Sequence, residues 1–336
     1  MAMKRANGLL VQIIEPDNLR LAAWKAAKGK RYAQAVLAYH ADLETNLMRL
    51  RSQIISGQVE VGDYNYFKVY EPKERQICAS AFKEQVLHHA LMNVCHDRFD
   101  RAQIHDSYAS RKGKGNFAAV QRTRHFSHRH IWFLKLDVRK FFESVHHDVI
   151  RQQLARLFKE QGLLEILDAI LGSYEAHPHR GVPIGNLTSQ YFANHYLAGL
   201  DHFIKEELRI KAYVRYMDDM VLWHKDKSVL KVALREIADH LQTRLRCELK
   251  PPLMNRCERG LPFLGYRVFP HHLRLLQKSK VRFIRKMKRI EKNYRSGAWS
   301  EEACARHAWP LIAFTEHADA KVFRKEVLLY LKGQSS

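Results

Sequence analysis

The amino-acid sequence predicts an α+β fold, in which short antiparallel strand pairs are combined with longer helical segments. Residues 64–77 and 212–223 alternate apolar and polar side chains on both sides of a turn, as strand pairs do. Elsewhere, apolar residues recur at helical spacing over long stretches. The 336 residues suffice for two or three subdomains, and we expect these to be packed together because no repeat or low-complexity linker separates them.

The expected elements can be placed along the chain from these patterns and from turn residues. In the first helical region Asp17 is the expected N-cap, and the first strand pair turns at Glu71–Glu74. We expect helices at about 17–57, 81–99, 147–172, 188–208, 229–245 and from 278 onwards; strands at 64–77, 131–136, 212–223 and 263–269; and a glycine-rich basic loop that runs into a helix over 107–120.

The charge balance is the most unusual feature of the composition. The chain has 57 Lys+Arg against 35 Asp+Glu, a net charge of +22. A charge this large implies a polyanionic partner, and for a folded basic protein that partner is most often nucleic acid. The alternative is a basic surface that only confers solubility.

Other features bear on compartment and on metal sites. The five cysteines form no C-x-x-C pair, so we expect neither a disulfide framework nor a zinc ribbon. The apolar stretch near the N-terminus is interrupted by Glu15 and Asp17, too soon for a signal peptide. No apolar run approaches the length of a membrane span. We therefore expect a cytoplasmic protein with no membrane partner.

Two adjacent acids, Asp218 and Asp219, lie in the middle of an apolar segment with the alternation of a hairpin. Acids in such a place are costly to bury as anions unless a cation neutralises them. Because neighbouring strand residues point to opposite faces, a turn is needed to aim both at one ion. For this pair alone, an exposed hairpin turn is an equally good interpretation.

A third acid, Asp137, ends the apolar segment 131–136. If the strands lie side by side, three carboxylates converge, and such a cluster repels itself without a divalent metal. Hard oxygen ligands select Mg²⁺. Two Mg²⁺ ions about 3.5–4 Å apart, held by acids, are the arrangement used for in-line nucleotidyl transfer.

Four segments resemble, in order and spacing, motifs A, B, C and E of reverse transcriptases: LKLDVRKFFESV, GVPIGNLTSQYFAN, RYMDDMVL and FLGYRV. Upstream, PKERQI and SYASRKGKG resemble the fingers motifs of bacterial reverse transcriptases. The similarity extends from about residue 29 to residue 267, and four ordered motifs argue strongly against coincidence.

The resemblance implies a right-hand polymerase fold, with fingers, a palm built on an antiparallel sheet and a helical thumb. We expect N-terminal helices and fingers at 1–130, the palm at 131–268 with 150–185 contributing to fingers and palm, and the thumb at 269–336. The implied activity is RNA-directed DNA polymerisation, a nucleotidyl transfer.

The resemblance also assigns the metal site. Asp137, Asp218 and Asp219 are the implied catalytic carboxylates, and they would bind two Mg²⁺ ions with the peptide carbonyl of Val138 as a further ligand. Mn²⁺ is the implied substitute for Mg²⁺.

Several residues are implied to contact the incoming nucleotide. Phe142 occupies the position where an aromatic ring excludes a 2′-hydroxyl and so selects deoxynucleotides; alternatively it is a core residue beside Phe141. Lys73 and Arg75, at the fingers turn, resemble the basic residues that close over the triphosphate. Arg111, in the glycine-rich loop, is a similar candidate for phosphate or template contact.

The resemblance further implies a primer grip at Phe263, Leu264, Gly265 and Tyr266, where a glycine lets the backbone approach the primer end. Beyond it, the helix from 278 to 295 has an apolar stripe of Phe283, Met287, Ile290 and Tyr294. On its other side lie Arg282, Arg285, Lys288, Arg289 and Lys292, a set that favours contact with a duplex backbone over a merely solvated face.

Motif B departs from the common form of the family. Most reverse transcriptases have Gln-Gly and then Ser-Pro, whereas this chain has Ile184 and Gly185 followed by Ser189-Gln190. That form resembles the enzymes of diversity-generating retroelements, which copy a template-repeat RNA with errors at adenines in mutagenic retrohoming. Ile184, Gly185 and Gln190 are thus expected near the nucleotide.

The implied partners are template RNA, the cDNA/RNA duplex, dNTPs and a small basic accessory RNA-binding protein. A retron-like or defence-associated reverse transcriptase is the alternative within the same chemistry. A non-catalytic RNA-binding scaffold is disfavoured by the intact acids, and an RNA-directed RNA polymerase is disfavoured by Phe142.

Overall fold

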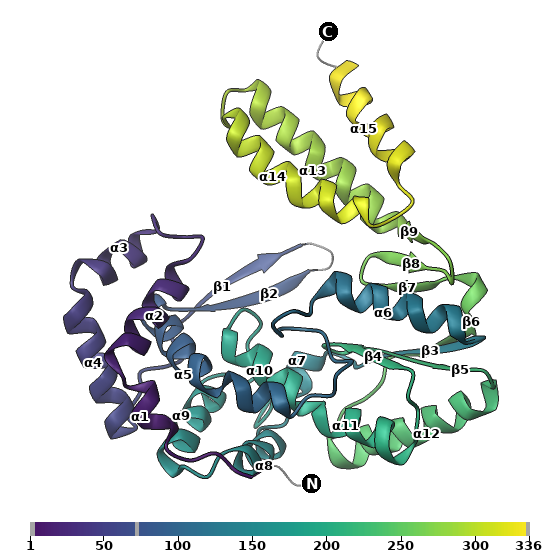
Figure 1. Ribbon diagram of the computed structural model, residues 1–336. Coiled ribbons are helices and arrows are strands. Elements are labelled where there is room, and N and C mark those ends of the chain that lie inside the picture. The colour runs from purple at the N-terminus through teal and green to yellow at the C-terminus, as the bar shows by residue number, and fades with distance from the viewer. Residues whose placement is uncertain (1–3, 71–73, 334–336) are drawn as a thin grey trace. The chain divides into compact units, whose positions relative to one another are not determined.

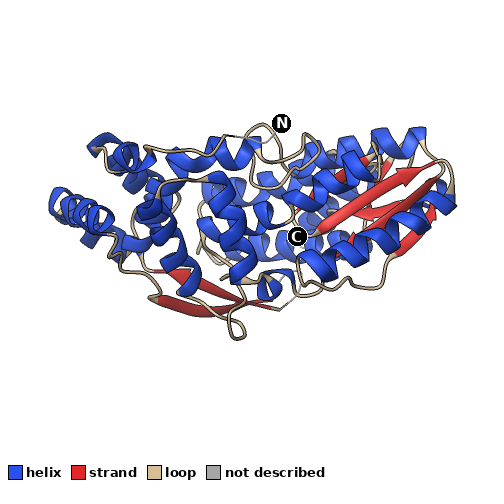
Figure 2. Cartoon of the chain, turned by 90° about the horizontal axis from the view of Figure 1, so that it is seen from below, coloured by secondary structure: helices blue, strands red, loops and turns tan. Residues whose placement is uncertain are grey.

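The computed structural model describes residues 4–70 and 74–333, with side chains up to residue 330. The chain forms two compact units, each assembled from three separate stretches of sequence. The first unit comprises Met1–His105, Asp137–Arg209 and Arg235–Lys250, and the second comprises Asp106–Leu136, Ile210–Leu234 and Pro251–Ser336. Helices predominate in both, and strands are confined to small sheets within the described ranges (Figure 2).

The first unit is mainly helical (Figure 1). Its elements are α1 (Leu9–Ile13), α2 (Pro16–Ala27), α3 (Gln34–Ala41), α4 (Leu43–Ser56), β1 (Tyr64–Val69), β2 (Arg75–Ser80), α5 (Phe82–Arg101), α7 (Phe141–Ser144), α8 (His147–Leu157), α9 (Gln161–Gly172), α10 (Leu187–Tyr196), α11 (Ala198–His202) and the π-helical turn η1 (Phe203–Glu207).

The second unit carries the larger sheets (Figure 1). Its elements are α6 (Asn116–Arg129), β3 (Trp132–Asp137, whose last residue belongs to the first unit), β4 (Tyr213–Tyr216), β5 (Asp219–His224), α12 (Lys227–Arg244, which continues into the first unit), β6 (Leu253–Arg256), the 3₁₀ turn η2 (Cys257–Arg259), β7 (Leu261–Phe263), β8 (Tyr266–Val268), β9 (Leu273–Leu275), α13 (Gln277–Arg295), α14 (Glu301–Glu316) and α15 (Lys321–Gly333).

The predicted helix 17–57 is wrong as a single element, because the structure has α2, α3 and α4 there. The backbone turns left-handed at Gly29 (φ 82°) and leaves the helical region at Asp42 (φ −131°, ψ 54°), so the helix cannot continue. The expected N-cap is also wrong by two residues: Glu15 precedes α2, and Asp17 lies in its first turn.

The predicted helix 147–172 is interrupted as well, by a tertiary contact. Phe158 is extended between α8 and α9. The flanking backbone pairs with Ala6, whose N–H donates to the Leu157 carbonyl at 2.8 Å and whose carbonyl accepts from Lys159 at 2.8 Å. The Glu160 carboxylate then accepts the N–H of Leu9 at 2.7 Å, satisfying an orphan donor of α1.

The predicted strand pair 64–77 is confirmed as β1 and β2. They are antiparallel, with Tyr64 opposite Ser80 and Val69 opposite Arg75. The predicted turn lies largely outside the described residues, since positions 71–73 are among those not described.

The sheet of the second unit has the strand order β4-β5-β3-β6, and β4 and β5 form the antiparallel hairpin predicted at 212–223. Buried apolar side chains of this sheet belong to the hydrophobic core of the unit, among them Phe133, Val221 and Trp223. The indole N–H of Trp223 donates to the Ser127 hydroxyl of α6 at 3.1 Å, so α6 is anchored on this sheet. A separate antiparallel sheet, β7-β8-β9, includes the strand pair predicted at 263–269.

The C-terminal helices α13, α14 and α15 follow β9 (Figure 1). Phe283, Met287 and Ile290 are buried as predicted, and they pack with Val327 of α15. Tyr294 does not complete this stripe, because it is 51% exposed. Trp299, from the segment before α14, packs on the cluster instead. Among the described residues, no helix combines the length and apolar character needed to cross a membrane.

Candidate active site

The acidic pair lies at the tip of the β4–β5 hairpin in the second unit. Tyr216 pairs with Asp219, so Met217 and Asp218 alone form the turn. Met217 has a φ of 53°, a left-handed conformation that is uncommon for a residue with a long side chain. Strain of this kind persists where the surrounding structure enforces it, and it is concentrated at functional sites.

Arg215 supports this turn from inside the unit. Its side chain is fully buried, and Nη1 donates to the carbonyl of Met217 at 3.2 Å. Its backbone also holds the start of the glycine-rich loop: Arg215 N–H donates to the Asp106 carbonyl at 3.0 Å, and its carbonyl accepts from Tyr108 at 2.9 Å. One residue therefore ties the acidic turn to the segment before the loop.

Asp219 is paired with a lysine of the neighbouring strand. Lys135 Nζ lies 3.0 Å from Oδ1 and 3.1 Å from Oδ2 of Asp219. The same ammonium donates to the carbonyl of Pro262 in β7 at 3.0 Å. Both side chains are mostly buried, with about a fifth of each exposed (20% and 21%). The contact therefore links the acidic hairpin to the strand that precedes the predicted primer grip.

Asp137, in the first unit, is also paired with a lysine. Lys250 Nζ donates to Asp137 Oδ1 at 2.5 Å, and the Lys250 backbone N–H donates to the Asp137 carbonyl at 2.8 Å. The next residue, Val138, is fully buried and forms an antiparallel bridge with Leu249. The segment after β3 is thus fixed by main-chain pairing before the chain turns into α7.

The carboxylates suit a divalent cation in both chemistry and surroundings. Carboxylate oxygens are the ligands that Mg²⁺ prefers. Asp137 and Asp219 each hold a lysine ammonium, so both carboxylates stabilise a positive charge, but the ammonium groups compete with a metal ion for the same oxygens. Within the described residues, no three His, Cys, Asp or Glu side chains lie close enough together to hold a metal ion. The convergence of the three acids stays a prediction.

Phe142 lies in the short helix α7 and is half-buried, whereas its neighbour Phe141 is buried (3% exposed). The two rings are 5.9 Å apart, and Phe141 also packs on Tyr196. The core position in this pair therefore belongs to Phe141. The carbonyl of Phe142 accepts the N–H of Val182 at 2.8 Å, which holds the segment before Ile184 against α7.

The motif B segment lies beside β2. The N–H of Cys78 donates to the Ile184 carbonyl at 2.8 Å, and the N–H of Ser80 donates to the Asn186 side chain at 3.3 Å. Gly185 has a φ of 132°, and a Cβ there would lie 3.0 Å from both the Cys78 carbonyl oxygen and Ile77 Cγ2. Only glycine fits this approach without displacement. The Ile184 side chain is half-buried.

The other predicted nucleotide contacts are placed as follows. Arg75 begins β2 and is exposed, while Lys73 lies outside the described residues. Gln190 is half-buried in α10. Arg111, in the second unit, donates through Nη1 to the Ser107 carbonyl at 2.9 Å, so it braces the glycine-rich loop. The structure thus brings Arg75, Phe142 and the motif B residues into the first unit and Arg111 into the second.

The predicted primer grip is the β7–β8 hairpin of the second unit. Phe263 and Tyr266 are buried and paired, so Leu264 and Gly265 form a two-residue turn. On α13, the predicted basic residues Arg285, Lys288, Arg289 and Lys292 are exposed. Arg282 is half-buried, and its guanidinium lies 5.6 Å from the ring centre of Phe314.

Comparison with known proteins places this arrangement in a family. The family described as "Reverse transcriptase (RNA-dependent DNA polymerase)" matches residues 72–268, more than half of the 336 residues. This chain belongs to the reverse transcriptase family.

Individual relatives are more distant. The putative COX1/OXI3 intron 1 protein of Saccharomyces cerevisiae is 20% identical over 227 residues, which cover 62% of this chain and 27% of that protein. The chain thus spans about a quarter of the length of that curated relative.

Solved structures share the fold at low sequence identity. Apo telomerase from Candida tropicalis has a TM-score of 0.52 and 10% identity, covering 87% of this chain and 66% of that chain. The telomerase of the same organism in complex with a TWJ fragment of telomeric RNA has a TM-score of 0.50 and 12% identity, covering 79% and 56%. The predicted right-hand polymerase fold, with mixed helices and antiparallel sheets, is confirmed.

Sequence reasoning missed four residues that shape the site of this reverse transcriptase: Lys135, Lys250, Arg215 and Asn186. Lys135 interrupts an apolar strand two residues before Asp137, and an alternating strand puts both on one face, a signal that was available. Arg215 is likewise a charge within an apolar strand. Lys250 and Asn186 act through contacts more than 100 residues away in sequence, for which spacing gives no signal.

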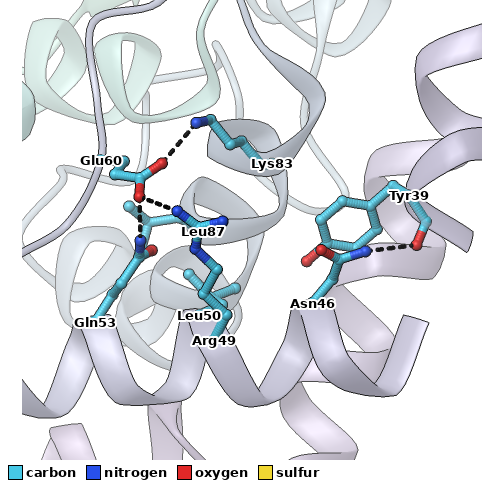
Figure 3. A pocket seen from close by; sticks show the side chains of 8 residues that line it. All are labelled: Tyr39, Asn46, Arg49, Leu50, Gln53, Glu60, Lys83 and Leu87. Atoms are coloured by element: carbon cyan, nitrogen blue, oxygen red, sulfur yellow. Dashed lines mark hydrogen bonds and ion pairs between the residues drawn. The ribbon is translucent and has the colours of Figure 1, made fainter. Parts of the chain in front are cut away.

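The reverse transcriptase also has a cavity of about 110 Å³ between α4 and α5 (Figure 3). Glu60 is one of its lining residues, and the Glu60 carboxylate accepts from Arg49 at 2.6 Å, Lys83 at 2.6 Å and Gln53 at 2.9 Å. The bonds from Lys83 and then Arg49 lower the pKa of Glu60. These side chains are largely exposed, and such surface pairs contribute little to stability. None of the predicted site residues lines this cavity.

Proposed function

We propose that this chain is an RNA-directed DNA polymerase that uses Asp137, Asp218 and Asp219 to hold two Mg²⁺ ions for nucleotidyl transfer. The observation that carries the proposal is the family match over residues 72–268, within which all three acids lie. Such ions stabilise the attacking and leaving oxygens of an in-line displacement. The chain's own contribution is to fix the carboxylates: Arg215 braces the turn before Asp218, and main-chain pairing fixes Asp137.

The surrounding residues have proposed roles in binding and orientation. Lys73 and Arg75 would bind the triphosphate by charge-assisted hydrogen bonds. Phe142 would exclude the 2′-hydroxyl, and it is only half-buried, unlike the neighbouring core residue Phe141. The basic face of α13 would bind the duplex backbone, to which several exposed cations are suited. The substrates are accordingly dNTPs on a primed RNA template.

The finer proposal is that this enzyme belongs to a diversity-generating retroelement and makes error-prone cDNA from a template-repeat RNA. What supports it is motif B, in which Ile184 replaces the more usual glutamine. A glutamine amide can donate and accept hydrogen bonds near the nucleotide, whereas isoleucine can do neither. A small basic accessory protein that binds the RNA is part of this proposal.

The experiment copies one RNA template containing all four bases with purified enzyme, Mg²⁺ and dNTPs, and sequences the cDNA. The proposal predicts DNA products whose errors are concentrated opposite template adenines. Accurate copying at adenines would overturn the retroelement assignment and favour a retron-like or defence-associated enzyme. If the wild-type enzyme, shown to be folded, extends no primed RNA template, the polymerase proposal itself fails.

A further inference from the structure

The turn of the β7–β8 hairpin is strained. Leu264 has a φ of 45° and Gly265 a φ of 90°, so both turn residues are left-handed. Two consecutive left-handed residues are typical of a tight type I′ hairpin turn, in which Asn and Gly are preferred. A leucine at the first position is unfavourable on its own. An observed strain of this kind points to a functional constraint on the turn.

The C-terminal helices crowd the glycine of this turn. A Cβ on Gly265 would lie 2.8 Å from Cζ of Phe314 in α14 and 3.0 Å from Oγ of Ser279 in α13. The carbonyl of Gly265 accepts from the Ser279 hydroxyl at 2.7 Å and from the Leu276 N–H at 3.0 Å. Ser279 of α13 therefore binds the Gly265 carbonyl, and Phe314 of α14 packs against the Gly265 Cα. Crowding by the C-terminal helices is therefore a second reason why this position requires glycine, beside the predicted approach of the backbone to a primer.

Phe314 is in turn held by the residue after the glycine. The Tyr266 hydroxyl donates to the Phe314 carbonyl at 2.6 Å, and the two rings lie 4.6 Å apart at 34°. Burial raises the pKa of Tyr266 to about 12, so the phenol keeps its proton at neutral pH and remains a donor. The guanidinium of Arg282, on the predicted duplex-binding helix, lies 5.6 Å from the centre of the Phe314 ring.

We infer that Phe314 is a positioning residue that couples the C-terminal helices to the Leu264–Gly265 turn, so that the helix facing the duplex and the turn facing the primer end move together. The inference rests on the proposed function, because it takes the turn as the primer grip. A polymerase with this coupling holds the primer end in place only while α13 and α14 are docked on the hairpin. The coupling therefore acts on duplex retention more than on the chemical step.

The contact geometry predicts an unusual order of severity among substitutions of Phe314. The Phe314 ring points end-on at Gly265, with Cζ as the nearest atom. Phe314→Tyr would add an oxygen at this crowded atom, whereas Phe314→Leu keeps apolar bulk and relieves it. Tyrosine should therefore be the more harmful replacement, although it is chemically closer to phenylalanine. Leu311→Ala is a matched control on the same helix, because Leu311 packs against the Phe283 cluster and is not among the nearest neighbours of Gly265.

The experiment measures three quantities for wild type, Phe314→Ala, Phe314→Tyr, Phe314→Leu and Leu311→Ala: KM for a primed RNA template, kcat for one added nucleotide, and nucleotides added per binding event with a trap. Phe314→Ala should raise KM and shorten products by about fivefold or more, as the loss of a modest binding contribution does, with kcat little changed. Phe314→Tyr should resemble it, and Phe314→Leu should lie closer to wild type.

Hydrogen exchange provides a readout that needs no activity. The Leu276 amide is bonded to the Gly265 carbonyl, so Phe314→Ala should accelerate its exchange while Leu311→Ala should not. Equal KM increases for Phe314→Ala and Leu311→Ala at matched thermal stability, with unchanged exchange at Leu276, would overturn the coupling. If the wild type makes no DNA, the proposed function fails, and the exchange comparison still decides whether Phe314 holds the turn.

Discussion

Lys135 contacts both carboxylate oxygens of Asp219, at 3.0 and 3.1 Å, and also donates to the Pro262 carbonyl at 3.0 Å. One ammonium group therefore links the predicted metal-binding hairpin to the strand that leads into the predicted primer grip. Because both side chains are mostly buried, the pair is not merely a solvent-exposed ion pair, whose contribution would be small.

Lys135→Met should lower the free energy of unfolding and impair DNA synthesis. The substitution keeps most of the aliphatic bulk but removes the cation from a mostly buried carboxylate, a change that costs about 1–3 kcal/mol. Urea unfolding measures the effect, and Lys135→Arg should retain most of the stability. Lys227→Met is the matched control. Lys227 lies over the ring of Trp132, which is in β3 like Lys135, and it makes no ion pair with Asp219. Equal stability of Lys135→Met and wild type would contradict the assigned role.

Gly185→Ala should destabilise the first unit by about 1–3 kcal/mol, because the residue is left-handed and its Cβ would meet the Cys78 carbonyl and Ile77. Thermal or urea unfolding measures the change. Gly172→Ala is the control: Gly172 is helical with open space around its Cβ, so alanine there should be neutral or stabilise by up to about 1 kcal/mol. Similar effects of the two variants would show that the contact with β2 does not constrain Gly185.

Phe142→Ala should raise ribonucleotide incorporation while leaving the fold intact. Removing a half-buried ring opens space for a 2′-hydroxyl, and a gain of about tenfold in the rNTP/dNTP ratio corresponds to about 1.4 kcal/mol. Single-nucleotide extension with dNTP and rNTP provides the ratio. Phe141→Ala should instead cost about 3–5 kcal/mol of stability, because that ring is in the core. An unchanged ratio in Phe142→Ala would remove it from sugar selection.

Ile184→Gln should make the enzyme more accurate, most visibly opposite template adenines. The Ile184 backbone carbonyl, which accepts from Cys78, is unaffected by the change, so the effect is isolated to the side chain. One added hydrogen bond is worth roughly 0.5–1.5 kcal/mol, or up to about tenfold in discrimination. Sequencing of cDNA from both enzymes on one RNA tests this. Identical error spectra at similar activity would instead indicate that Arg75 or the RNA–partner complex sets the error rate.

The polymerase motifs and the fold class could be predicted because they depend on local patterns. The alternation around Asp218 and Asp219 marks the hairpin, and the ordered motifs indicate the family. The interruption at Phe158 could not be predicted, because it depends on pairing with Ala6, some 150 residues away in sequence. Tyr294 fitted the helical stripe, but it is exposed, and Trp299 from the segment after α13 packs on the cluster, which the periodicity of one helix cannot indicate.

Site residues were predicted where a motif contained them and missed where partners are distant. Lys250 pairs with Asp137 across 113 positions, and no spacing rule connects them. The side chain of Asn186 precedes α10 as a helix cap would, yet it accepts from Ser80 of β2 instead. Such contacts depend on the tertiary arrangement, which overrides the local role of the residue.

The central claim, that Asp218 and Asp219 carry the chemistry of an RNA-directed DNA polymerase, is tested most directly by one measurement. Primer extension on an RNA template with dNTPs and Mg²⁺ is compared between wild type and Asp218→Asn/Asp219→Asn, with RNA binding and thermal unfolding measured in parallel. The amides should abolish extension while RNA binding is retained, since the acids serve the metals. Asp219→Asn should also lower the unfolding temperature, because it leaves the mostly buried Lys135 ammonium without its carboxylate, so extension is compared at a temperature at which both proteins are folded. Extension by the double variant at the wild-type rate would contradict the assignment.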